Sequence, residues 1–190
     1  MKVKPILFST PMVQAILEGR KTQTRRIIKP QPIKRFAQDG FSFYHIPNVG
    51  AIDETLKHNK KAKYVVGDSL WVRETWCNLE ESNPPKVEYA YKADDYTHQP
   101  KWKPSIFMPK EACRLFLKVT NVRVEKLQDI SEEDAKSEGA FDMNCGVNGK
   151  TLYKSGFQSL WESINGKESW KSNPYVWVYE FKLTKKPNNF

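Results

Sequence analysis

The sequence predicts one α+β domain over residues 1–190, built on a small, mainly antiparallel β-barrel or half-barrel with short flanking helices. Three observations lead to this fold class. The length of 190 residues suits a single domain with a substantial core. At least five segments have the apolar and β-branched patterns of strands, and only short helical segments lie between them. Short helices among several strands are typical of a sheet that curls into a barrel.

Composition predicts a folded, basic chain. Hydrophobic residues make up 39% of the sequence and aromatic residues 13%, so apolar burial can offset the entropy lost on ordering. Lysine and arginine number 31 against 22 acidic residues, which gives a formal net charge of +9. This excess favours an anionic partner such as a nucleotide or nucleic acid, although it also serves solubility.

Cysteine usage and hydropathy bear on the compartment. The three cysteines, Cys77, Cys113 and Cys145, are scattered, and no CxxC pair accompanies the three histidines. This pattern argues against a disulfide framework and against a zinc site, so we expect no metal and no cofactor. No segment approaches the ~20 apolar residues of a membrane span. We therefore expect a soluble, cytoplasmic protein without a membrane partner.

Three helices are expected from caps and apolar spacing. Residues 10–19 begin with a capping threonine and a proline and end at a glycine. Residues 131–139 begin with a serine and three carboxylates, which suit the positive end of the helix dipole, and also end at a glycine. Residues 157–164 place apolar side chains at the i, i+3, i+4, i+7 spacing of one helical face.

Strands are expected between these helices and at the end of the chain. They are predicted at residues 24–29, 69–76, 87–92, 114–125 and 175–183. Three further stretches are interpreted as insertions, at about residues 31–63, 77–110 and 140–156. The first of these has no sustained period, and we expect it to be partly irregular.

The densest functional signal is the run from Gly19 to Arg26, which has four cations, two hydroxyls and no carboxylate. One interpretation is a solvated turn and an edge strand whose cations oppose aggregation. The other is a binding or catalytic site. In an extended strand, Lys21 and Thr24 would lie about 10 Å apart and face opposite ways. For both to reach one substrate, the chain must turn between them.

Several sequence blocks together resemble one family, the ASCH domain, whose fold is a PUA-like β-barrel. The blocks are the Gly-x-Lys-x-x-Thr-x-Arg pattern of residues 19–26, the Gly67-Asp68-x-Leu70 turn, the segment 127–139 and the closing run 176–181. They stand in family order over nearly the whole chain. The segments 71–76 and 102–105 are similar to those of ASCH proteins carried by phages and prophages.

The resemblance implies an activity and the residues for it. One ASCH branch hydrolyses the amide of N4-acetylcytidine with a lysine, a threonine and a glutamate, which match Lys21, Thr24 and Glu138 here. The motif arginine of that branch matches Arg26. Other ASCH proteins are inferred to bind RNA or are reported as ribonucleases, and the motif does not choose among these activities.

Amide cleavage needs a nucleophile, a proton shuttle and positive charge for the oxyanion. We expect Thr24 as the nucleophile, Glu138 as the base and Lys21 as the charged group. In the alternative, Lys21 is the base, which requires burial to lower its pKa by roughly 3 units. Glu138 also stands at the end of its predicted helix, where a carboxylate opposes the dipole by about 0.3–1 kcal/mol. Either it has a function there or it is an ordinary exposed glutamate.

Substrate contacts are expected from five further residues: Arg25, Arg26, Glu74, Trp71 and Trp76. Glu74 can line the pocket, or it can form a structural ion pair with a cation such as Lys21, Arg25 or Arg26. The two tryptophans can stack on a base or fill the core. Relatives of the phage type often carry histidine where this chain has Phe107, so a catalytic role of that histidine would be missing here.

Two hypotheses follow. The first is a metal-independent amidohydrolase that acts on N4-acylated cytidine or a related modified pyrimidine nucleoside. The second is a binding module or nuclease for single-stranded nucleic acid, in which Lys21, Arg25, Arg26 and the lysines of residues 57–63 neutralise phosphates. The two differ in salt dependence. Phosphate binding weakens with a log–log slope of about −0.7 per contact, whereas binding of a neutral nucleoside changes little.

Overall fold

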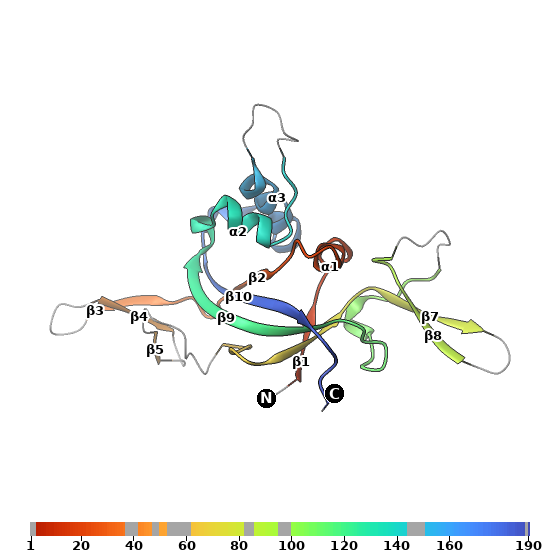
Figure 1. The fold of residues 1–190 in the computed structure, drawn as a ribbon. Helices are drawn as coiled ribbons and strands as arrows, with labels where there is room; N and C mark the ends of the chain where they lie inside the picture. The colour runs from red at the N-terminus through yellow and green to blue at the C-terminus, as the bar shows by residue number, and fades with distance from the viewer. Residues whose placement is uncertain are drawn as a thin grey trace. The chain divides into compact units, whose positions relative to one another are not determined.

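The structure is a computed structural model that describes residues 3–36, 42–46, 50–52, 62–81, 86–94, 100–143, 151–188 and 190. Its architecture is α+β (Figure 1). The helices are α1 (Thr10–Leu17), α2 (Glu132–Ser137), α3 (Tyr153–Asn165) and α4 (Glu168–Lys171), with two single turns, η1 (Ser105–Phe107) and η2 (Leu127–Asp129). The strands are β1 (Val3–Leu7), β2 (Gln23–Ile27), β3 (Ile33–Phe36), β4 (Ser42–Ile46), β5 (Gly50–Ile52), β6 (Ser69–Arg73), β7 (Trp76–Glu81), β8 (Lys86–Tyr91), β9 (Phe116–Lys126) and β10 (Tyr175–Thr184).

The main sheet has five strands in the order β1-β6-β9-β10-β2. β1 pairs with β6 in parallel, whereas the β6–β9 and β10–β2 pairs are antiparallel. A closed barrel would require the two outer strands to pair with each other. Among the described strands they do not, because β1 and β2 are the two edges of the sheet. The expected barrel is thus corrected to an open, mixed sheet.

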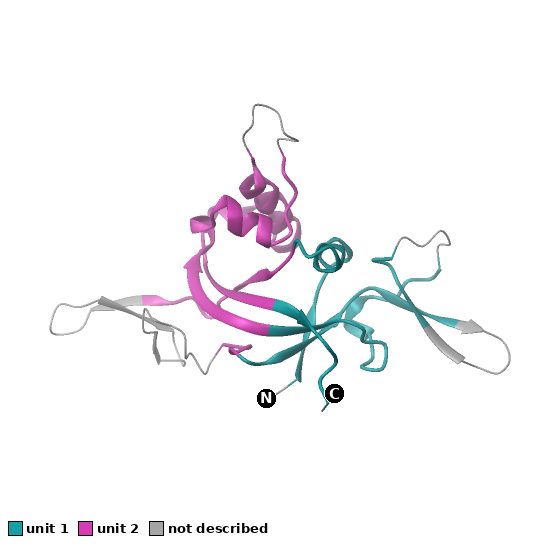
Figure 2. Ribbon diagram, viewed as in Figure 1, with its two compact units in different colours: residues 1–20, 67–118, 182–190 teal, residues 21–66, 119–181 magenta. Residues whose placement is uncertain are grey.

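The chain divides into two compact units, which Figure 2 shows in different colours. Unit 1 comprises residues 1–20, 67–118 and 182–190. It contains β1, α1 and β6, the antiparallel hairpin of β7 and β8, and the single turn η1. A buried cluster of Trp76, Met108 and Ala112 packs beneath the partly buried Tyr89 and Tyr91 of the hairpin.

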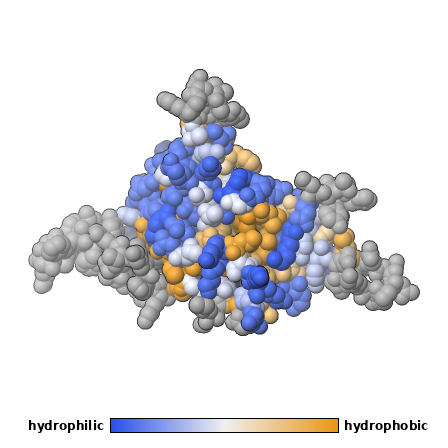
Figure 3. Space-filling model, in the orientation of Figure 1, coloured by the Kyte–Doolittle hydropathy of each residue, from blue (hydrophilic) through white to orange (hydrophobic). Residues whose placement is uncertain are grey.

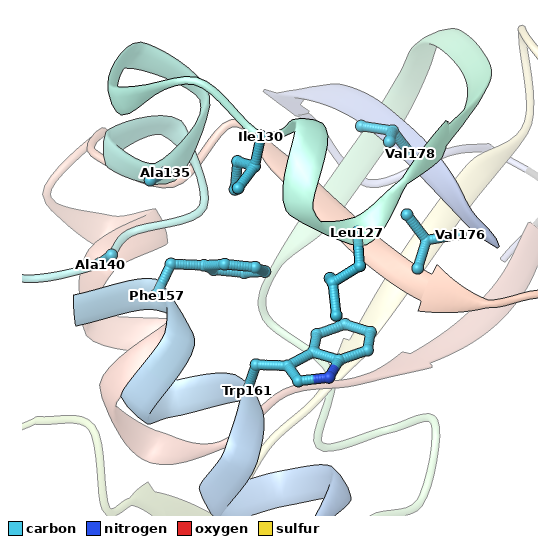
Figure 4. Packing of buried hydrophobic residues seen from close by; sticks show 8 residues of the cluster. All are labelled: Leu127, Ile130, Ala135, Ala140, Phe157, Trp161, Val176 and Val178. Atoms are coloured by element: carbon cyan, nitrogen blue, oxygen red, sulfur yellow. The ribbon is translucent and has the colours of Figure 1, made fainter. Parts of the chain in front are cut away.

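Unit 2 comprises residues 21–66 and 119–181 and contains α2, α3 and β2. Its core is a cluster of eight buried residues, shown in Figure 4: Leu127, Ile130, Ala135, Ala140, Phe157, Trp161, Val176 and Val178. Phe157 and Trp161 lie one helical turn apart on α3, as the sequence spacing predicts. On the face shown in Figure 3, hydrophilic residues cover most of the surface over α2, so the helix presents its polar side outward.

Helix α2 begins and ends where its sequence signals predict. The Ser131 hydroxyl accepts a hydrogen bond from the Asp134 amide at 3.0 Å, which caps the first turn. Three carboxylates stand in that turn, and Gly139 has a φ of 80° just after the last residues of the helix. The cap matters for function because α2 carries Asp134 and ends directly before Glu138.

The predicted insertions contain more regular structure than their sequences indicate. In the first, β3, β4 and β5 form a three-stranded antiparallel sheet. Strands of three to five residues are too short for a period-2 pattern to stand out. The predicted strand 69–76 is divided between β6 and β7, and β1 and α4 were not predicted. Among the described residues, no helix has the length and apolar character needed to cross a membrane.

Candidate active site

Lys21 is buried just before β2, and its ammonium is surrounded by oxygen atoms. The side chain is 0% exposed. Nζ donates to the main-chain carbonyls of Gln23 and Glu138, both at 2.8 Å, and to Glu138 Oε2 at 3.0 Å. The backbones of Lys21 and Glu138 also form an isolated antiparallel bridge. Two of the three residues predicted for catalysis, 117 positions apart in sequence, therefore meet inside unit 2.

Glu138 is the C-cap residue of α2 and is buried rather than exposed. Its side chain is 3% exposed and is shared between two cations. Oε2 accepts from Lys21, and Oε1 accepts from Arg25 Nη1 at 3.1 Å. These cations compensate for the unfavourable position of a carboxylate at the negative end of a helix. The alternative of an ordinary surface glutamate is wrong.

Arg25 is the centre of a wider ion-pair network. Its side chain is 0% exposed, and Nη2 contacts Glu125 at 2.8 Å and Asp134 at 2.9 Å. Arg123 joins the same network through Glu125 and Asp134. The guanidinium of Arg25 is always charged, so Glu138 has a cationic partner whatever the protonation state of the lysine. Arg25 was expected to contact substrate; in the structure it is buried and contacts the carboxylates of Glu125, Asp134 and Glu138.

Thr24 is buried, at 2% exposure, and stands next to Gln23 in β2. It pairs with Tyr179 of β10, and alternation along the strand places it on the opposite face from Gln23 and Arg25. In the part of the chain that the structure describes, no hydrogen bond joins the Thr24 hydroxyl to Lys21 or Glu138. The Lys21 ammonium donates to the carbonyl oxygen of Gln23, and the carbon of that carbonyl is bonded to the Thr24 nitrogen. One peptide unit therefore separates the ammonium from Thr24.

Burial sets the protonation behaviour of the site. Desolvation lowers the pKa of Lys21, although the Glu138 carboxylate opposes the change. For Asp134, burial favours the neutral acid, but a hydrogen bond from Gln23 and the charge of Arg25 outweigh it and lower the pKa. The site thus combines a lysine shifted toward the neutral amine with a carboxylate shifted toward the ionised form.

Three predicted substrate-binding residues, Trp71, Glu74 and Trp76, belong to unit 1, whereas the network around Arg25 belongs to unit 2. Glu74 is 1% exposed and forms a bidentate ion pair with Arg114, with both contacts at 2.9 Å. The cation paired with Glu74 is therefore Arg114, which lies in the same unit, and not Lys21, Arg25 or Arg26. Burial is the larger influence on Glu74 and raises its pKa despite that arginine.

The two tryptophans lack the exposed face that stacking on a base requires. Trp71 is 6% exposed and contacts the ring of Phe190 at a centroid distance of 5.8 Å. Trp76 is 5% exposed and packs edge-on against Tyr89. The core alternative therefore describes both residues better than base stacking does. Arg26, the remaining predicted contact, is half-buried on the same face of β2 as Thr24.

The sequence did not single out several members of the network. Gln23 donates to the Asp134 carbonyl at 2.8 Å, and Arg123 and Glu125 contact each other from one strand. The spacing of Arg123 and Glu125 was a usable signal, since residues two apart share a face of a strand. Asp134 was visible in the sequence as a carboxylate in the first turn of a helix, but the helix dipole is a sufficient reason for a carboxylate there, so it did not indicate a site. Among the described residues, no group of three or more potential metal ligands gathers.

Comparison with known proteins gives distant similarity only. No family model matches the chain, and no curated protein matches it. The hypothetical protein PH0355 has a similar solved structure with 10% identity and a TM-score of 0.43, over 96% of this chain and all of that one. The ASCH domain from Lactobacillus crispatus JV V101 has 12% identity and a TM-score of 0.44, over 96% of this chain and 79% of that one.

Proposed function

We propose that this chain is an ASCH-type domain that hydrolyses the amide of an N4-acylated cytidine or a related modified pyrimidine nucleoside. The observation that carries the proposal is the buried contact between Lys21 and Glu138, one peptide unit from Thr24. Burial of an ion pair is costly, and strongly perturbed groups of this kind concentrate at functional sites. The motif of residues 19–26 contains both Lys21 and Thr24, and it is the reason to connect the Lys21–Glu138 pair with Thr24.

The proposed reaction uses the three side chains in sequence. The step requires the Thr24 side chain to come within hydrogen-bond distance of the base, because no hydrogen bond joins them among the described residues and Thr24 lies on the opposite face of β2 from Arg25. The Thr24 hydroxyl then attacks the amide carbonyl carbon and gives its proton to the base. The tetrahedral intermediate collapses, the C–N4 bond breaks, and the base returns the proton to the leaving amine of cytosine. Water then hydrolyses the threonine ester and releases the carboxylic acid. Arg26 shares the face of Thr24, so its charge is placed to stabilise the oxyanion.

The contacts favour Lys21 as the base over the division expected from the sequence. Burial lowers the pKa of Lys21, which enriches the neutral amine that a base requires. Glu138 has a second cationic partner, Arg25, at 3.1 Å, and this contact remains when the amine is neutral. In this version Glu138 orients the amine and stabilises its protonated form after proton transfer.

The alternative function, a module that binds nucleic acid through the motif cations, loses two of its expected contacts. The side chains of Lys21 and Arg25 are 0% exposed and already contact carboxylates. A phosphate would have to displace those carboxylates to bind there. The amidohydrolase is therefore the function that this site supports better.

The decisive assay is incubation of the purified protein with N4-acetylcytidine, with cytidine release followed by chromatography. We expect turnover that depends little on salt, because the nucleoside is neutral. Thr24→Ala and Glu138→Gln should each lower kcat/KM on the order of 100-fold or more. Absence of turnover with acetyl and with bulkier acyl groups would refute the proposed activity.

Two matched variants control for loss of fold. Thr22→Ala removes an exposed hydroxyl two residues before Thr24 and should leave kcat/KM unchanged. Asp68→Asn breaks another lysine–carboxylate pair, with Lys4 at 2.6 Å, whose carboxylate is 7% exposed. If Asp68→Asn lowers activity as much as Glu138→Gln, the effect of the latter is structural and Glu138 has no catalytic part.

A further inference from the structure

Unit 1 presents two neighbouring apolar side chains on a well-fixed turn. Phe107 is 69% exposed and Ile106 is 58% exposed, both in η1. The turn is held from several sides: the Phe107 amide donates to the Pro104 carbonyl at 3.0 Å, and the Arg73 guanidinium donates to the Ile106 carbonyl. The next residue, Met108, is 1% exposed and anchors the turn in the core.

Several cations of unit 1 have no carboxylate partner among the described residues, although the exposed Glu111 directly follows Lys110 in sequence. Segment 101–110 contains Lys101, Lys103 and Lys110, all exposed, and no acidic residue. Among the described residues, none of these lysines, nor Arg73 or Lys186, has a carboxylate within ion-pair distance. Uncompensated cations in one place create a positive potential that attracts a polyanion.

Several of these cations also contact aromatic rings. Lys110 and Lys186 each lie 5.5 Å from the centroid of the Phe190 ring. Phe190 packs against Trp71, and the Arg73 guanidinium lies 5.3 Å from the Trp71 ring. Two lysines and an arginine thus lie around one pair of rings, Trp71 and Phe190, that contact each other at a tilt. Cation–π contacts offset part of the repulsion between these like charges.

We infer that this surface of unit 1 binds single-stranded nucleic acid. Phe107 supplies an exposed ring on which an unpaired base stacks, and Lys110 and Lys186 neutralise phosphates of the same strand. Stacking rings next to a cationic track are how proteins bind single strands without sequence preference. The inference does not depend on the proposed hydrolysis, because it uses none of the residues of that site.

Charge complementarity favours a nucleic acid over a protein partner. An apolar protein contact would gain from Ile106 and Phe107 but would have to desolvate the surrounding lysines, and lysine is depleted in protein–protein interfaces. A single strand uses both features at once, since bases stack on the ring while phosphates face the cations. A duplex keeps its bases paired and cannot use the ring.

The test measures fluorescence anisotropy of labelled oligo(dT) and oligo(U) strands of about 12 nucleotides, the upper range of a single-strand site. We expect both strands to bind, with a duplex of equal length weaker. Phe107→Ala should weaken strand binding by roughly 5- to 150-fold. The double variant Lys110→Ala, Lys186→Ala should reduce the log–log salt slope by about 1.4. A third strand, oligo(dU), differs from oligo(U) only in the 2′-hydroxyl, so comparison of these two decides whether that group contributes.

Matched controls separate this surface from exposed residues in general. Phe141, in unit 2, is 66% exposed, and Lys171 has a side chain that is 84% exposed. Phe141→Ala and Lys171→Ala should leave strand binding unchanged, and Glu138→Gln should too, whether or not hydrolysis is found. Equal binding by Phe107→Ala and the unaltered protein would overturn the inference. So would self-association that Phe107→Ala abolishes in a protein that binds no strand.

Discussion

At the scale of single residues, Glu138 is shared between two cations of different kinds. Glu138 has contacts to both Lys21 and Arg25, and the arginine also binds Glu125 and Asp134. A lysine retained at 0% exposure beside a charged arginine is better explained by its ability to lose a proton, which arginine lacks.

Lys21→Arg tests whether that proton is used. If Lys21 is the base, the variant keeps the positive charge but loses the base, and kcat should fall on the order of 100-fold or more. The activity of the unaltered protein should rise with pH, because deprotonation of Lys21 creates the active form. The measurement is kcat against pH for both proteins. If Lys21→Arg keeps a substantial part of the activity, Lys21 acts as a fixed charge and Glu138 is the base.

Misfolding of the larger arginine side chain is checked separately. Near-ultraviolet circular dichroism and urea unfolding of Lys21→Arg should match those of the unaltered protein. Where they do not, the pH profile of the unaltered protein decides alone. A profile in which activity rises with pH nowhere in the range of stable fold contradicts Lys21 as the base.

At the scale of elements, the site depends on a helix of six residues. Isolated helices of this length do not form in water, so α2 needs its cap and its packing. Ala135 packs into the unit 2 core, and Ser131 caps the first turn. Both hold the last residues of the helix near the start of β2, where the Thr22 amide donates to the Ser137 carbonyl at 2.8 Å.

Ser131→Ala removes the cap and should lower the free energy of unfolding by about 1 kcal/mol. The reason is that the Asp134 amide loses the acceptor that it has at 3.0 Å. Urea unfolding measures the change. Ser163→Ala is the control, since Ser163 is exposed in the interior of α3 and alanine has the higher helix propensity. An equal loss in both variants, or none in Ser131→Ala, contradicts the role given to the cap.

The elements could be predicted where their signals are local. An apolar 3.6-residue period identified α1 and α3, a cap identified α2, and alternation identified β9 and β10. The cap predicted at Thr10 is wrong, because Ser9 is the N-cap residue of α1 and its side chain makes no cap bond. β1 was missed because its Lys4 and Pro5 interrupt the apolar pattern, and its pairing with β6 is a contact between distant segments. The open sheet could not be predicted either, because closure depends on whether two distant strands meet and not on the pattern of each strand.

At the scale of the whole molecule, the same limit applies to the site. The pair of Lys21 and Glu138 came from resemblance to a family, since no local pattern links residues 117 positions apart. The network around Arg25 could not be predicted, because its members come from β2, β9 and α2. Sequence patterns specify which side chains are buried in each element, and the fold decides which of them meet.

Buried tyrosines in both units predict how the whole molecule responds to alkali. Burial raises the pKa of Tyr91, in unit 1, and of Tyr64, in unit 2, from 10.0 to about 12, and it raises that of Tyr179 further. The unfolded chain releases these protons first, so the stability is present below about pH 10 and is lost as pH rises toward about pH 12. Lys21 has the opposite effect, because its pKa is lowered in the folded protein, but its effect on the pH dependence of stability ends near pH 10.5, the pKa of the unfolded chain.

We therefore expect the free energy of unfolding to fall steeply above about pH 10.5, and urea titrations with absorbance at the phenolate band should show it. Tyr64→Phe should make the fall shallower, whereas reversible ionisation of all tyrosines near pH 10 without unfolding would contradict the burial argument.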